Sequence, residues 1–302
     1  MVTQKTRKYN GPYEGEFLNR VAFPLGGIGA GMICLEGTGA LSHVSLHGKP
    51  DVFNEPMMFS SVCVLGERNV ARVLEGPVPR WKVFGPAGTG NGAGEKNYGL
   101  PRCSDAVFET RFPFATVGLA DARLALEVEL MGWSPFVPGD ADDSSLPVAA
   151  LEYRFRNSTD EPVEAVYSFH ARNFMSVTPP DITGASGAGS AVTTTQGGFV
   201  LSQNGSAERR CDHGAFSAAV DDPDVKVNCA WFRGGWFDPL TMVWKTVSEG
   251  QAVEADPLTE GAPSPGGSLY VPFQLDPGEE KTIRLHLAWY VPDPGVYVGE
   301  RR

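Results

Sequence analysis

Apolar and polar residues alternate strictly in several short runs of this chain, which is the pattern of half-buried β-strands. The runs recur from Leu124 to Trp289. The rows predicted to face the core are Leu124/Leu126/Val128/Leu130, Leu151/Tyr153/Phe155, Ala165/Tyr167/Phe169, Val225/Val227/Cys229/Trp231 and Ile283/Leu285/Leu287/Trp289. A polar turn at residues 157–162 separates the second row from the third, so residues 148–171 are predicted to form a hairpin.

No stretch keeps a 3.6-residue apolar period, so we expect little helix beyond short turns. Many short strands separated by turns predict an all-β fold, here a large two-sheet antiparallel β-sandwich. The Gly- and Ser-rich stretches 85–94 and 183–190 cannot pack a core and are expected to be surface loops. An interdomain linker is the alternative for residues 183–190. The alternation has the same character on both sides, so residues 1–302 are interpreted as one domain.

Composition and charge narrow the range of partners. The chain has 36 Gly, 24 Pro and 17 Phe, and a formal net charge of −11, which argues against nucleic acid or an anionic membrane. No apolar run approaches the length of a membrane span, and no apolar stretch follows the charged N-terminal residues as in a signal peptide. The five cysteines are widely spaced without a CxxC pair. They are interpreted as reduced and structural, which predicts a cytoplasmic protein.

The glycine-rich segment at residues 23–31 resembles a phosphate cradle only superficially. No register supplies G-x-G-x-x-G, and no Lys-Ser/Thr pair follows, so a nucleotide cofactor is not expected. A strand followed by a tight turn is the better interpretation. Its glycines, Gly26, Gly27, Gly29 and Gly31, stand where side chains would clash.

The most polar segment runs from Trp133 to Ser145 and contains Asp140, Asp142 and Asp143. Clustered carboxylates suit a hard cation or a glycosidase pair, but the EF-hand spacing is absent. We favour a loop that hydrogen-bonds its own backbone. The five His show no metal spacing, so neither a metal nor another cofactor is expected.

Aromatic residues concentrate between residues 231 and 244. Trp231, Trp236, Phe237 and Trp244 suit either sugar stacking or core packing. Core packing is favoured because large aromatic side chains dominate sandwich cores.

Several motifs together resemble glycoside hydrolase family 116, which includes non-lysosomal glucosylceramidases and bile-acid β-glucosidases. They are found in the expected order at residues 23–31, 47–54, 112–115, 132–140, 143–148, 234–238 and 275–292. The resemblance implies a β-sandwich that packs against a C-terminal (α/α)6 barrel. It also implies retaining cleavage of β-glucosides by a Glu nucleophile and an Asp acid/base, both in the barrel.

No catalytic residue can therefore be assigned to this chain. After Pro292 only ten residues remain, and nothing here is expected to form the barrel. We expect the chain to brace a barrel, in cis or on a separate chain, and to help shape its β-glucoside site. The Gly26–Gly31 turn and the Trp133–Ser145 loop are expected at one end of the sandwich, with Trp133 and Asp140 nearest the sugar. An exposed apolar patch is expected where the barrel would pack.

Two alternatives stay open. A free-standing carbohydrate-binding module would need exposed, coplanar aromatic side chains on one sheet face, with Trp133 and Trp236 as candidates. A self-sufficient hydrolase would need two of the carboxylates of Asp140, Asp142 and Asp143 buried in a cleft.

Overall fold

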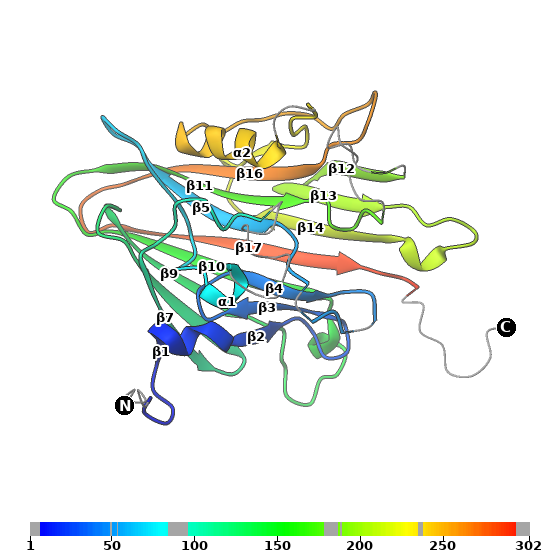
Figure 1. Cartoon of the computed structure of the whole chain (residues 1–302), viewed down its shortest axis with the longest axis horizontal. Coiled ribbons are helices and arrows are strands. Elements are labelled where there is room, and N and C mark those ends of the chain that lie inside the picture. Colours follow the sequence, from blue (N-terminus) through cyan, green and yellow to red (C-terminus); the bar gives the residue numbers. More distant parts are fainter. Residues whose placement is uncertain are drawn as a thin grey trace.

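The computed structural model describes residues 7–293 except 49, 53, 84–95, 178–186, 188 and 235–237. The loop predicted at 85–94, most of the one at 183–190, and Trp236 and Phe237 therefore lie outside the described residues. Strands make up most of the regular structure in the described part, and neighbouring strands pair antiparallel within three sheets. The predicted all-β sandwich class is confirmed (Figure 1).

The largest sheet has nine strands. In spatial order they are β1 (Tyr13–Glu14), β7 (Asp105–Arg111), β8 (Phe114–Ala120), β9 (Leu126–Trp133), β10 (Val148–Asn157), β17 (Glu280–Tyr290), β14 (Gly214–Val220), β13 (Gly198–Gln203) and β12 (Ser190–Thr195). Its inner face carries the predicted apolar rows of β9, β10 and β17, because successive side chains of a strand point to opposite faces.

A five-stranded and a three-stranded sheet form the facing layer. The first contains β15 (Lys226–Asn228), β16 (Gly266–Leu275), β11 (Val163–Arg172), β5 (Met58–Val64) and β6 (Val70–Val73); the second contains β2 (Ala22–Leu25), β3 (Met32–Glu36) and β4 (Leu41–Ser45). Side chains of both sheets share one core cluster with the nine-stranded sheet. The small third sheet adds to the two predicted from the sequence.

The predicted core rows are buried in four of five cases, apart from the half-buried Leu124 ahead of β9. In the fifth row, Val225 and Val227 are half-buried against the main core, whereas Trp231 packs in a separate cluster beyond β15. Alternation therefore identifies the buried faces well, and it fails where the chain leaves the strand.

The predicted hairpin at residues 148–171 is wrong. β10 pairs with β9 and β17 in the nine-stranded sheet, whereas β11 pairs with β5 and β16 in the facing sheet. The polar turn thus carries the chain between layers. The two rows pack face to face across the core, with the rings of Tyr153 and Tyr167 5.1 Å apart between centroids.

Helices are few in the described part of the chain. They are α1 (Arg80–Val83), α2 (Pro239–Ser248) and the 3-10 turns η1 (Gly15–Arg20), η2 (Asp143–Ser145) and η3 (Arg210–Asp212). α2 covers the outer face of the five-stranded sheet through Val243 and Val247 (Figure 1). Asp238 caps it by accepting a hydrogen bond from the Thr241 amide, and Pro239 is its first residue, both typical of a helix start.

Candidate domain-interface site

The glycine turn connects β2 to β3 at one end of the small sheet. Gly26, Gly29 and Gly31 all have positive φ. Gly27 has an ordinary φ, but a Cβ atom there would lie 2.3 Å from the carbonyl oxygen of Leu146. Such a contact is impossible without moving backbone. Gly26, Gly27 and Gly31 therefore stand where a side chain would clash, as the sequence predicted, whereas a Cβ atom at Gly29 would meet nothing within 4 Å.

That other segment is the loop between β9 and β10. The amide of Gly27 donates to the Leu146 oxygen at 3.1 Å, and the amide of Ile28 donates to the Ser144 oxygen at 2.7 Å. The Gly26 amide donates to Oγ of Ser134 at 3.0 Å. The two segments singled out in the sequence are thus bonded to each other at one end of the sandwich.

Trp289 ties this junction to the nine-stranded sheet. Its Nε1 donates to the Ala30 oxygen at 2.6 Å, and its amide donates to the Pro147 oxygen at 3.0 Å. The indole is buried and lies 3.1 Å from where a Cβ of Gly26 would be. The alternation in the sequence places Trp289 only in a core row. Its bonds to both loops carry no sequence signal, since the loops are distant from β17 in the chain.

The aspartates of the loop organise the loop itself. Oδ1 of Asp140 accepts a hydrogen bond from the Asp143 amide at 3.0 Å, which is the Asx pattern favoured from the sequence. Oγ of Ser144 bonds to both the amide and the oxygen of Val137. The side chains of Asp140, Asp142 and Asp143 are exposed. The buried pair that a self-sufficient hydrolase would need is therefore not formed by these residues.

Trp133 lies at the end of β9 on the outer face of the nine-stranded sheet. It is half-buried and pairs across strands with Phe114 and Ala150. Its position on the sheet is thus beside the loop, but on the face that points away from the core.

Large apolar side chains are exposed around this junction. We call them the apolar rim: Ile28, Phe112, Phe114, Phe136, Val137 and Leu146. Ile28 is 65% and Phe112 is 61% exposed, and the rings of Phe112 and Phe136 contact each other at 5.0 Å between centroids. The sequence predicted an apolar patch without naming these residues. The only sequence feature that points to them is that they lie in the motifs at 23–31, 112–115, 132–140 and 143–148.

The last described strand also ends here. β17 finishes at Tyr290, one residue beyond Trp289, and Tyr290 is exposed. Residues 291–293 follow from this end of the sheet (Figure 1).

Comparison with known families gives this arrangement a context. A family model described as beta-glucosidase 2, glycosyl-hydrolase family 116 N-term, matches residues 22–301. The chain belongs to this family. The match includes both segments of the junction and the whole apolar rim, so the rim is part of the family 116 N-terminal domain. A search of curated proteins found no match.

Several solved structures resemble the family 116 domain distantly. A polysaccharide lyase is 14% identical with a TM-score of 0.33, over 91% of this chain and 33% of its own. A GH36 α-galactosidase from Geobacillus stearothermophilus is 11% identical with a TM-score of 0.28, over 61% of this chain and 25% of its own. A protein described as an aldose 1-epimerase from Escherichia coli K12 is 11% identical with a TM-score of 0.42, and the match covers 90% of this chain and 99% of its own. The chain thus spans a third or less of the first two.

The cysteines and the tryptophans near α2 are mostly buried. All five cysteines are free, and burial raises the pKa of Cys34, Cys63 and Cys229 to about 11 and that of Cys103 to about 12. Such thiols stay protonated and unreactive. Trp231 is buried against α2 and Trp244 is half-buried there, as core packing predicted.

Neither a metal cluster nor a membrane span is found in the described ranges. No three His, Cys, Asp or Glu side chains there are grouped so that they could hold a metal ion. None of the helices in those ranges has the length and apolar character needed to cross a bilayer.

Proposed function

We propose that this domain is the non-catalytic N-terminal part of a retaining β-glucosidase or glucosylceramidase-like hydrolase, and that it braces the catalytic (α/α)6 barrel. Membership of the family supports the class of enzyme. The barrel would be joined in cis or supplied by a separate chain, and the substrate would be a β-glucoside bound at the shared site. A cytoplasmic location completes the proposal, because free, buried cysteines suit a reducing compartment.

The observation that carries the proposal is the apolar rim around a rigid junction. Exposed aromatic and aliphatic side chains that gather at one end of a domain mark interaction sites. The hydrogen bonds from Gly27 and Ile28 hold the two loops in place, so little ordering would be needed on docking. We assign the rim to the barrel contact, with Trp133 and Asp140 nearest the sugar.

The test is binding of this chain to a separately produced family 116 barrel, measured by calorimetry. Phe136→Ser with Leu146→Ser should weaken binding at least tenfold, because both side chains would be buried in the contact. Tyr9→Ser is the control, since Tyr9 is even more exposed than either residue but lies outside the rim. Equal binding by the double variant and the control would refute the assignment.

A second assay addresses catalysis. The chain alone should not hydrolyse nitrophenyl β-glucoside, since the family's two carboxylates belong to the barrel. Turnover that survives purification and is lost in Asp142→Asn would contradict this prediction.

Carbohydrate binding without a barrel is the second candidate function. The aromatic residues proposed for it give little support, since Trp133 is half-buried and Trp236 lies outside the described residues. The observation that favours it is instead a hollow on the outer face of the nine-stranded sheet.

A further inference from the structure

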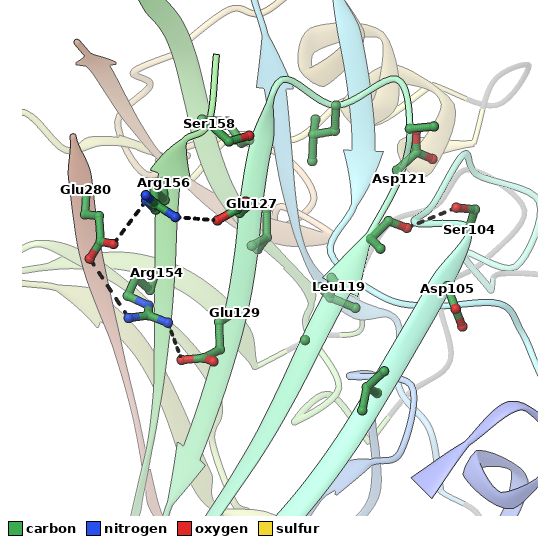
Figure 2. A pocket seen from close by; sticks show the side chains of 17 residues that line it. Ser104, Asp105, Leu119, Asp121, Glu127, Glu129, Arg154, Arg156, Ser158 and Glu280 are labelled. Atoms are coloured by element: carbon green, nitrogen blue, oxygen red, sulfur yellow. Dashed lines mark hydrogen bonds and ion pairs between the residues drawn. The ribbon is translucent and has the colours of Figure 1, made fainter. Parts of the chain in front are cut away.

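The outer face of the nine-stranded sheet is hollowed above β8, away from both the core and the apolar rim. Figure 2 shows the side chains that line this hollow, which has a volume of about 990 Å³. Its floor includes Gly118 and Ala120, the outward residues in the second half of β8. One wall is Asp105 and Val107 of β7, which pair with Ala120 and Gly118.

The opposite wall is a ladder of charged side chains from three strands. Arg154 of β10 lies between Glu129 of β9 at 3.1 Å and Glu280 of β17 at 4.0 Å. Arg156 lies between Glu127 at 3.2 Å and Glu280 at 3.6 Å (Figure 2). These ion pairs are half exposed, so they contribute little to the stability of the fold. They do hold hydrogen-bond donors and acceptors along one side of the hollow.

Gly118 has no explanation if this face of the sheet is in contact with water alone. It lies in the middle of β8, paired with Val107 and Glu129, and no positive φ or bulge requires glycine there. A Cβ atom at this position would meet nothing within 4 Å. Glycine inside a strand weakens the strand, and it often marks a bulge or the close approach of a ligand or of another backbone. The glycine keeps open a space that any larger residue would fill.

The dimensions and the charges of the hollow limit the ligands that it could bind. Neighbouring strands lie about 4.8 Å apart, so side chains of β7 and β9 face each other across about 9.6 Å. Five carboxylates line it against two guanidinium groups, namely Asp105, Asp121, Glu127, Glu129 and Glu280 against Arg154 and Arg156. Asp121 is compensated by Arg72, at 2.8 Å. The remaining excess of negative charge opposes sulfated, phosphorylated or acidic ligands.

We propose that this hollow binds a neutral oligosaccharide chain laid along β8. Each sugar hydroxyl both donates and accepts, and the ladder offers carboxylate acceptors beside guanidinium donors. The apolar floor at Gly118, Ala120 and Leu124 would take the C–H surface of the rings. The site is separate from the apolar rim, so the proposal does not depend on docking to a barrel.

The experiment titrates cellotetraose and maltotetraose into the whole chain by calorimetry, with saturation-transfer NMR to detect weak binding. At least one should bind, and Gly118→Thr should weaken its affinity at least tenfold by filling the floor. The melting temperature of this variant should stay equal or rise, because threonine suits a strand better than glycine. Gly99→Thr is the matched control, because a Cβ atom at Gly99 would also meet nothing within 4 Å and Gly99 lies outside the hollow.

A second pair of variants tests the wall without changing the floor. Glu129→Gln should weaken sugar binding several-fold, whereas Glu109→Gln, on the outer face of β7 but outside the hollow, should not. Absence of binding by both sugars would overturn the proposal. So would unchanged affinity in both Gly118→Thr and Glu129→Gln, or binding of spermine in place of the sugars.

Discussion

Replacing Lys82 with methionine removes a cation that two largely buried carboxylates share. Its Nζ lies 2.7 Å from both side-chain oxygens of Glu36 and 2.9 Å from Oε1 of Glu55. The side chains of Lys82 and Glu36 are less than a tenth exposed. Tyr98 donates to the other oxygen of Glu55 at 2.8 Å, so the network is bonded on several sides.

The expected cost follows from what is left behind. Methionine keeps most of the volume of lysine, so the packing term is small. Removing one partner of a buried ion pair costs about 3–5 kcal/mol, because the remaining charge is desolvated and uncompensated. At about 2 °C per kcal/mol for a chain of this size, the melting temperature of Lys82→Met should fall by about 6–10 °C.

The assay is urea unfolding of the chain and its variant at pH 7, followed by tryptophan fluorescence. Adding Glu36→Gln to Lys82→Met should recover part of the loss, since it removes one stranded charge. A loss below about 1 kcal/mol would refute the reasoning, since it would place Lys82 in the class of exposed pairs.

The same network gives a pH dependence with a definite sign. Burial opposes the charge on Lys82, but Glu36 and Glu55 outweigh it and raise the pKa of the ammonium above its usual 10.5. A raised pKa in the folded state contributes stability that is full below the unfolded value and lost as pH rises through the folded value. The difference between the chain and Lys82→Met should therefore hold from about pH 7 to about pH 10 and shrink only above that.

Two further predictions concern single buried positions. Burial lowers the pKa of His170 from 6.5 to about 3, so the folded state should lose roughly 1 kcal/mol of stability per pH unit as pH falls from 6.5 toward 3. In urea unfolding at acid pH, His170→Gln should remove that part of the pH dependence, and an unchanged pH dependence would contradict the prediction. Gly27→Ala should lower the free energy of unfolding by about 1–3 kcal/mol and speed hydrogen exchange of the Ile28 amide, because its Cβ would overlap the Leu146 oxygen. Gly99→Ala should do neither, and equal exchange rates in the two variants would contradict the prediction.

The sequence predicts buried faces better than strand partners. The alternation at Leu151–Phe155 and Ala165–Phe169 identifies which side chains enter the core, because alternation depends only on residues two apart. Pairing depends on distant segments, and β10 and β11 could meet either edge to edge or face to face. In the structure the two strands pack face to face, with the rings of Tyr153 and Tyr167 tilted against each other across the core. The short polar turn between the strands looks the same locally as a hairpin turn.

Helix α2 escapes prediction for a related reason. It is only ten residues long, and its buried side is spread over Val243 and Val247 with Trp244 beside them, too few for a sustained period. The local signal is at its start, where Asp238 precedes Pro239 as a cap before a helical proline.

The two candidate sites differ in how far sequence can reach them. The glycine turn and the aspartate loop stand out because their composition exceeds what a strand connection needs, and the structure bonds them together at Gly27 and Leu146. The hollow leaves no such trace. Gly118 is one glycine among 36, and only the register of β7, β8 and β9 places it between Val107 and Glu129. The hollow is formed by strands that are neighbours in the sheet, and this neighbourhood cannot be read from one strand alone. Its residues become meaningful together only after the strand order is known, which is why the strand-centred glycine, rather than any motif, is the decisive position to substitute.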